Sequence, residues 1–201
     1  MIALGFRPKT GWTSVVLLDG PAAEPRVLDS RRIELADPDV PESRQPYHAG
    51  FGTFQEDDAE VQRLVAANRR FARRVLAELL REYEAAGRTP VASAIVAGSD
   101  VDPARIANLH MRAHALEGRL YRDLVEETMR EAALPCALLI ERDLFATAAG
   151  RFGLPEDRLK RAAAQLGKSG GKALGGPWRA EEKAAAMAAW LVMVEAVGSR
   201  A

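Results

Sequence analysis

The chain has 201 residues, of which 48% are hydrophobic, and this is enough for one substantial core and favours a single domain over residues 1–201. Lysine plus arginine and aspartate plus glutamate each number 28, which excludes the strong global positive charge that commonly accompanies nonspecific nucleic-acid binding. The single cysteine, Cys136, excludes an intramolecular disulfide, and no apolar run approaches the roughly 20 residues that span a bilayer, so we expect a cytoplasmic protein without membrane contact.

The first part of the chain alternates hydrophobic runs with turn signals, and this predicts three antiparallel strands. Residues 1–8 form the first strand, residues 11–20 its hairpin partner and residues 25–36 the third strand. A polar connection with proline and glycine follows at about 37–57. A loop of that length inside a compact domain is typically either mobile or functional.

Helical periodicity begins near Asp58 and continues to Gly87, which predicts a long amphipathic helix. Its polar side carries a cluster of arginines: Arg69, Arg70, Arg73 and Arg74. Such a cluster is typical of a solvated helix face, and it also suits the binding of an anionic partner.

The rest of the chain alternates buried strands with helices. Residues 90–98 predict a buried parallel strand, and Pro103 suits the first turn of a second long helix that runs to about Ala133. Residues 136–140 predict the next buried strand. The remaining elements are a helix near 156–166, a loop with glycine and lysine at about 167–179, and a closing helix that contains Met187 and Trp190. Three strands followed by crossover helices and parallel strands predict a mixed α/β sheet covered by helices.

The second long helix carries a possible ligand group. His110, His114 and Glu117 are spaced i, i+4 and i+7, so all three project from one helix face. This face suits a transition metal, a phosphate or another ligand, and polar packing of the helix explains the same pattern. His48 of the long loop would complete the group if the fold brings it there. The glutamate that a zinc-peptidase motif places directly after the first histidine is missing.

The Gly167-Lys168-Ser169 segment is partly similar to a phosphate-binding loop. The fuller pattern fails, because Ala162 stands where that motif has its first glycine and no strand precedes the segment. Lys168, Lys172 and Arg179 would nevertheless suit electrostatic contact with phosphate, and a solvated loop is the alternative.

The order of the elements resembles the RNase H-like superfamily. Three short segments, 3–12, 153–165 and 181–191, are similar to bacterial Holliday-junction resolvases of the RuvC type. The resemblance implies an RNase H-like mixed sheet. It also implies carboxylates on the first strand, on the fourth strand and, as a pair one turn apart, on the last helix, where they hold the divalent metal ions of a nuclease.

The chain departs from this pattern at most of those positions. The first-strand position matches Arg7, a permanent cation, and the fourth strand offers only residues 96–98, which are valine, alanine and glycine. On the last helix Glu182 matches the first acidic position and Ala185 the second, and Glu181 would substitute only through a shift of register.

Glu141 and Asp143, directly after the fifth strand, are the alternative acids. They are either ordinary polar residues at a strand end or, if they approach Glu181 or Glu182, members of a relocated metal site.

These observations predict a catalytically impaired RNase H-like domain that acts by binding a protein partner or structured nucleic acid, without a cofactor. The expected binding residues are Arg7 and Lys9, the arginine cluster of the first long helix, and the basic residues at 168–179. The alternatives are an active metal-dependent nuclease with relocated carboxylates and a structural homo-oligomer. The resemblance further predicts that Arg7 and residues 96–98 lie on neighbouring strands.

Overall fold

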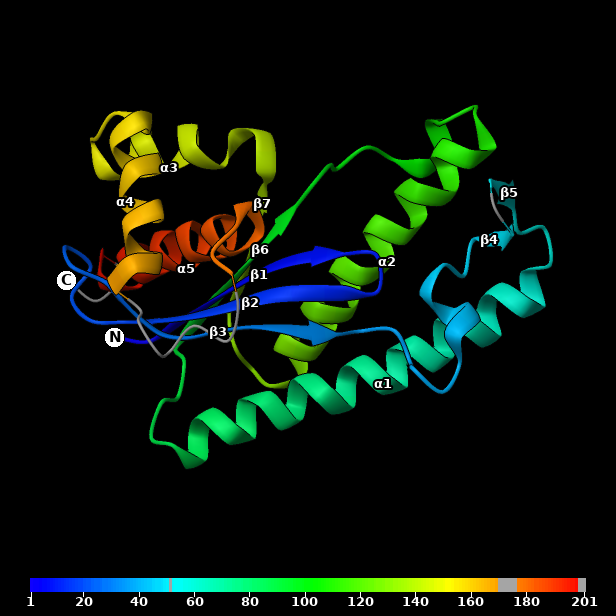
Figure 1. The fold of residues 1–201 in the computed structure, drawn as a ribbon, viewed down its shortest axis with the longest axis horizontal. Coiled ribbons are helices and arrows are strands. Elements are labelled where there is room, and N and C mark those ends of the chain that lie inside the picture. Colours follow the sequence, from blue (N-terminus) through cyan, green and yellow to red (C-terminus); the bar gives the residue numbers. More distant parts are fainter. Residues whose placement is uncertain (51, 170–176, 199–201) are drawn as a thin grey trace.

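The computed structural model describes residues 1–50, 52–169 and 177–198. Its centre is a five-stranded mixed sheet (Figure 1). The strands lie in the spatial order β3 (Arg26–Glu34), β2 (Trp12–Asp19), β1 (Ala3–Lys9), β6 (Ala92–Ala97) and β7 (Cys136–Ile140). The neighbours β3, β2 and β1 are antiparallel, whereas β1, β6 and β7 are parallel. Because Phe6 pairs with Ile95, the predicted adjacency of Arg7 and the end of β6 is confirmed.

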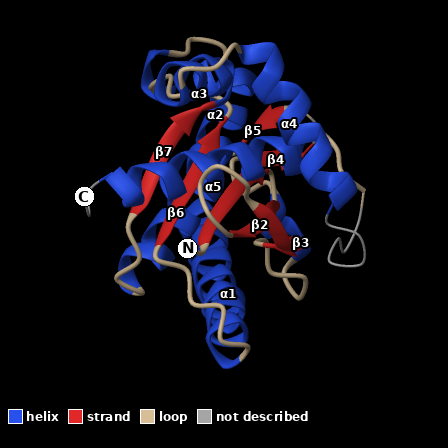
Figure 2. Ribbon diagram, turned by 90° about the vertical axis from the view of Figure 1, so that its left-hand side faces the viewer, coloured by secondary structure: helices blue, strands red, loops and turns tan. Residues whose placement is uncertain are grey.

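Helices cover both faces of the sheet. One face carries the long helices α1 (Asp58–Ala85) and α2 (Leu109–Glu131). The other face carries α5 (Ala180–Gly198), on which α3 (Leu144–Phe152) and α4 (Glu156–Ser169) pack. Figure 2 shows α5 crossing one face of the sheet.

The side chains of β1 explain why the two faces accept different helices. Successive residues of a strand point to opposite faces. Leu4 and Phe6 enter the core formed with α1 and α2, whereas Ala3 and Gly5 face α5. A Cβ atom at Gly5 would lie 1.8 Å from the carbonyl oxygen of Ala185, so the backbone of α5 rests directly on the strand.

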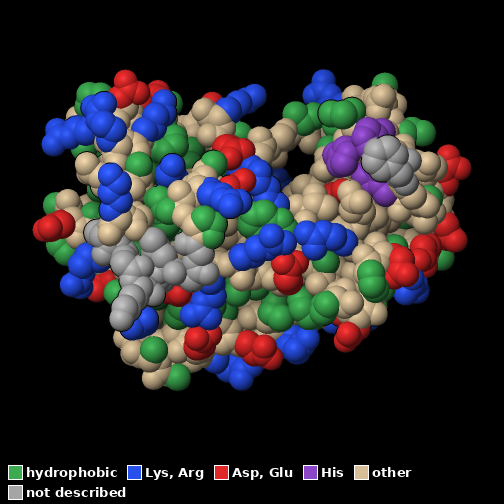
Figure 3. Space-filling view, viewed as in Figure 1, with side chains coloured by type: hydrophobic (Ala, Val, Ile, Leu, Met, Phe, Trp, Pro, Cys, Tyr) green, Lys and Arg blue, Asp and Glu red, His purple; other side chains and the backbone are tan. Residues whose placement is uncertain are grey.

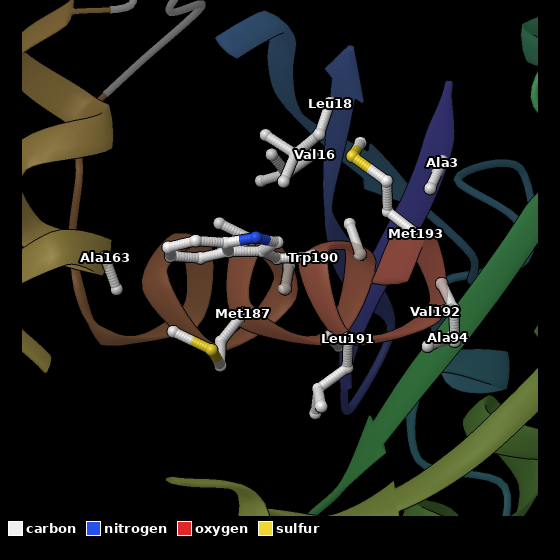
Figure 4. Close-up of a cluster of buried hydrophobic side chains, with 14 of the residues drawn as sticks. Ala3, Val16, Leu18, Ala94, Ala163, Met187, Trp190, Leu191, Val192 and Met193 are labelled. Atoms are coloured by element: carbon white, nitrogen blue, oxygen red, sulfur yellow. The ribbon is translucent and has the colours of Figure 1, made fainter. Parts of the chain in front are cut away.

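Helix α5 is apolar around its whole circumference, as expected for a helix buried on several sides. Figure 4 shows its larger side chains, among them Met187, Trp190 and Met193, between the sheet and the neighbouring α4. The indole Nε1 of Trp190 donates to the carbonyl of Ala22 at 2.7 Å, which ties α5 to the turn between β2 and β3. In the described part of the chain, no helix is both long and apolar enough to cross a membrane.

One predicted segment contains short elements that the sequence does not predict, and one predicted boundary is wrong. The connection at 37–57 contains a 3₁₀ turn (Pro41–Arg44) and a hairpin of β4 (His48–Gly50) and β5 (Thr53–Phe54). The second long helix begins at Leu109, because the Asn108 side chain caps it by accepting from the Met111 amide. Pro103 instead begins a separate short 3₁₀ turn that ends at Arg105.

The sequence also misplaces the elements before α5. It misses α3 altogether, and it predicts a loop from Gly167 although α4 continues to Ser169. The glycine has a packing role, because a Cβ atom there would lie 2.2 Å from the ring of Trp178. The Trp178 indole donates to the carbonyl of Ala163 at 2.8 Å and so closes over the end of the helix.

Candidate functional site

The carboxyl end of β1 carries a buried cation. The Arg7 side chain is only 6% exposed, and its Nε and Nη2 donate to the two carboxylate oxygens of Glu141 at 3.1 and 2.5 Å. Its Nη1 donates to the carbonyl of Pro8 at 2.7 Å and faces that of Val96 at 3.4 Å. The guanidinium therefore forms a bidentate ion pair with Glu141 and also contacts backbone carbonyls of β1 and β6.

The other two candidate acids at this edge are also engaged. Glu181 lies 3.5 Å from the Nζ of Lys9, and its pKa is lowered, chiefly by a backbone hydrogen bond and further by the Lys9 charge. Glu182 accepts from the Arg179 amide at 2.8 Å and from the Ser14 hydroxyl at 2.7 Å. Glu182 thus caps the start of α5, as a glutamate in the first turn of a helix commonly does.

This set of donors does not fit the divalent-metal site that the resemblance implies. Arg7 places a fixed positive charge where the first carboxylate would stand, and β6 ends in Ala97 and Gly98 without a ligand atom. Asp143 points away into an ion pair with Arg142. Among the residues that the structure describes, these acids do not converge into a group of three ligand atoms.

A cavity of about 250 Å³ opens beside Arg7, between the ends of β1 and β6 and one side of α2. Its lining includes four cations, Arg7, Lys9, Arg119 and Arg122, and also His114. No acidic residue is among the described residues that line it. Figure 3 shows lysine and arginine side chains on the floor of the hollow between the α3–α4 end of the molecule and the end that carries the histidines. The molecule is neutral overall, so this is a local concentration of positive charge.

The cations of this cavity differ in how firmly they are held. Arg122 is mostly buried and pairs with Asp100 at 3.1 Å and Asp123 at 2.9 Å. Lys9 and Arg119 are 37% and 56% exposed, and their acidic partners lie at 3.5 and 3.7 Å. Lys9 and Arg119 are therefore the two cations of this lining that an incoming anion reaches most easily.

The predicted arginine cluster of α1 is largely used to hold helices together. Arg69 pairs with Glu127 at 2.8 Å and Arg73 with Glu131 at 2.7 Å, so both bridge α1 to α2. Arg74 lies over the ring of Phe71 and 4.0 Å from Glu78. Arg70 is exposed on the same helix.

The basic residues before α5 are dispersed. Lys168 is exposed at the end of α4, and Lys172 lies outside the described residues. Arg179 is exposed and lines a second cavity of about 320 Å³, together with Trp12 and Arg32, whose guanidinium lies 4.2 Å from the Trp12 ring centre.

The histidine group forms, with a different membership from the one first expected. His48 of β4 joins His110 and His114, and one ligand atom from each lies within 4.8 Å of the others. Glu117, predicted from the sequence as a ligand, is not among the three grouped residues. Its carboxylate instead accepts a hydrogen bond from His48 Nδ1 at 2.7 Å. Burial raises the pKa of the Glu117 carboxyl, although the His48 hydrogen bond opposes this, and burial lowers the pKa of His114.

Sequence reasoning missed the role of Arg119 and Arg122. A signal was available, because His114, Gly118 and Arg122 follow one another at intervals of four residues and so share a side of α2. The pairing of Arg7 with Glu141 had no such signal, since 134 residues separate the two in the chain.

Comparison with protein-family models gives no match, and comparison with curated proteins gives none either. Solved structures do match. Thermus thermophilus RuvC in complex with a Holliday-junction substrate superposes with a TM-score of 0.59 at 14% identity, covering 100% of this chain and 98% of that one. A further structure of Thermus thermophilus RuvC gives 0.52 at 16% identity, covering 98% and 97%. These likenesses establish the RNase H-like fold and confirm the predicted resemblance to RuvC at the level of the fold.

Proposed function

We propose that this chain binds structured nucleic acid through the cation-lined cavity at the ends of β1 and β6, and that it does not cleave its ligand by divalent-metal catalysis. The cavity itself carries the proposal: four cations and no described acid line it, at the sheet edge where the resemblance places the catalytic carboxylates. A fold shared with a RuvC bound to a Holliday-junction substrate supports this choice of ligand class.

The chemistry of the cavity suits phosphate contact more than base reading. Arginine and lysine side chains fix the position of a phosphate backbone and carry no sequence information themselves. The buried Arg7 and Arg122 keep the cavity positive, and the more exposed Lys9 and Arg119 are placed to contact phosphate directly.

We expect the double change Lys9→Gln and Arg119→Gln to weaken binding of a labelled four-way DNA junction and to reduce the dependence of log affinity on log salt by about two. Each lost phosphate contact removes about one released counterion. Fluorescence anisotropy over a series of salt concentrations, with chelator present, measures both quantities. Duplex and single-stranded DNA of the same sequence test whether the branch is preferred.

Arg26→Gln is the matched control. Arg26 is 70% exposed and paired with Asp19 at 3.0 Å, much as Lys9 is paired with Glu181, but it lies at the opposite end of the sheet. This change should leave the salt slope unaltered. If Arg70→Gln with Arg74→Gln lowers the slope while the Lys9 and Arg119 variant does not, the binding surface is α1. Absence of binding to any of these nucleic acids at low salt refutes the proposal and favours a protein partner.

We also expect no cleavage of branched DNA, single-stranded DNA or RNA–DNA hybrid with magnesium or manganese. The change Arg7→Asp should not create such activity, because β6 still lacks an acid and Glu182 remains engaged at the start of α5. Gel analysis of labelled substrates after prolonged incubation tests this. Metal-dependent cleavage that disappears in Glu141→Gln or Glu182→Gln would show that the chain is an active nuclease with relocated acids.

A further inference from the structure

All three histidines of the chain meet at one place. His48 comes from β4, and His110 and His114 come from the first two turns of α2, 62 residues further along the chain. Figure 3 shows their side chains gathered in one patch at one end of the molecule. The cluster joins a hairpin strand to a helix that is distant in the chain, and the three rings contact one another.

Two of the nitrogen–nitrogen distances in the group are close to those of a tetrahedral metal site, and one ligand atom from each ring lies within 4.8 Å of the others. His48 Nε2 lies 3.4 Å from His110 Nδ1, and His110 Nε2 lies 3.2 Å from His114 Nε2. Two nitrogens that bind one zinc ion tetrahedrally at about 2.0–2.1 Å lie about 3.4 Å apart. His110 faces His48 with Nδ1 and His114 with Nε2. Because the His110 ring is exposed, a rotation of the ring would direct a single His110 nitrogen at the point that the His48 and His114 nitrogens also face.

Glu117 supplies the supporting contact that metal-binding histidines usually have. Its side chain is fully buried, and its Oε1 accepts from His48 Nδ1 at 2.7 Å. This hydrogen bond assigns the His48 proton to Nδ1 and leaves the Nε2 lone pair directed at the other two histidines. The Gln45 side chain and the Tyr47 backbone also contact the carboxyl, whose second oxygen, Oε2, is buried and lies 3.8 Å from His114 Nδ1.

A buried carboxylate is costly unless positive charge lies nearby. A dication held by the three imidazoles would provide that charge within a few ångströms. The same imidazoles line a cavity of about 650 Å³, which also contains Glu42, Arg44 and Gln45. A metal bound here would therefore keep one coordination position open to the cavity, for water or an anionic oxygen.

We propose that His48, His110 and His114 bind a divalent transition-metal ion of the zinc type, with Glu117 positioning His48 and the fourth position open to the cavity. Imidazole nitrogen is a preferred ligand of zinc, copper, nickel and cobalt, whereas magnesium and calcium prefer oxygen. The site shares His114 with the lining of the cavity beside Arg7, but the proposal does not rest on the proposed nucleic-acid binding.

The competing explanation is a chain of neutral imidazoles joined by N–H···N hydrogen bonds that ends on Glu117. The two explanations differ in measurable ways, because the chain contains only three imidazole rings. Without metal, long-range proton–nitrogen-15 correlation NMR should show three sets of imidazole ring signals, with the tautomer of each ring fixed by its hydrogen bonds. Binding of Zn²⁺ should move the coordinating nitrogen of all three rings, whereas a purely structural cluster stays unchanged.

The experiment uses the chain without an affinity tag of histidines, freed of metal by a chelator and then dialysed. Titration with Zn²⁺, followed by calorimetry and by metal analysis after gel filtration, is expected to give one ion per chain. Replacement by Co²⁺ should give the visible absorption bands of a four-coordinate site. Mg²⁺ in the same titration should give no signal at the imidazole rings.

Variants then locate the ion. His110→Ala or His114→Ala should abolish stoichiometric binding, and Glu117→Gln should weaken it by about 10–100-fold, because Glu117 acts only through His48. Met111→Ala and Glu126→Gln are matched controls on the same helix, both at exposed positions, and should bind Zn²⁺ normally. Far-UV circular dichroism confirms that each variant is folded.

The proposal fails if the protein takes up no Zn²⁺ in excess metal, or if His110→Ala binds as well as the unchanged chain. It also fails if binding persists in His110→Ala and disappears in Cys136→Ser, which would place the ion on β7. Ring signals that do not respond to Zn²⁺ would identify the cluster as a hydrogen-bonded chain.

Discussion

Replacing Gly5 by alanine is expected to lower the free energy of unfolding by about 3 kcal/mol or more. The added Cβ would lie 1.8 Å from the Ala185 carbonyl oxygen and 3.0 Å from the Ala189 amide nitrogen. Both obstacles are backbone atoms of α5, so no side-chain rotation relieves the clash. The helix must move off β1 and open contacts along the core on that face. Urea unfolding followed by far-UV circular dichroism measures the loss.

Gly150→Ala provides a control of opposite sign. Gly150 lies in α3, and no atom lies within 4 Å of the place where its Cβ would be. Alanine favours a helix over glycine by about 0.8–1.0 kcal/mol, so this variant should gain stability. A loss of less than about 1 kcal/mol for Gly5→Ala would mean that α5 shifts easily and would contradict its direct contact with the strand.

Asn68→Ala is expected to lower the free energy of unfolding by about 2–4 kcal/mol. Asn68 is fully buried on α1 and makes three hydrogen bonds. Its Oδ1 accepts from the Asp37 amide at 3.2 Å, and its Nδ2 donates to the Ser43 carbonyl at 2.5 Å and to the Tyr121 hydroxyl at 3.2 Å. The change leaves buried polar groups unpaired and opens a cavity.

A second measurement separates this local role from a general loss of packing. Because Asn68 attaches the 37–57 connection to α1 and α2, Asn68→Ala should accelerate proteolysis within that connection under native conditions. Gln62→Ala, at an exposed position of the same helix, should change neither stability nor cleavage. Equal cleavage in the Asn68 variant and the unchanged chain would show that other contacts hold the connection.

The sequence predicts best the elements whose burial pattern is complete within one segment. The apolar runs and the turn in residues 1–20 and the long apolar stripe of α1 identify these elements without knowledge of their neighbours. Element order adds the mixed sheet, because parallel strands need crossover helices. Helix α3 is missed since it is short and its apolar residues, such as Leu144 and Ala148, contact α5 and α4 rather than forming a long stripe.

The contacts that decide the chemistry are harder to predict, because they join distant segments. The Arg7 side chain is visible in sequence as a misplaced cation, but its pairing with Glu141 depends on β6 lying between β1 and β7. Similarly, the spacing of His110 and His114 predicts a shared helix face. Only the attachment of the 37–57 connection by Asn68 and Tyr121 brings His48 to that face.

The position of α5 on β1 also has a consequence for synthesis of the chain on the ribosome. Helix α5 follows every strand that it covers, so Ala3, Val16 and Ala94 remain uncovered until residues 180–198 have emerged. The meander of β1 to β3 can form early from local contacts, but one of its faces stays apolar and open to water during translation. Such a surface is where a nascent chain is held by chaperones or associates with another unfinished chain, and it makes docking of α5 the step that ends this exposure.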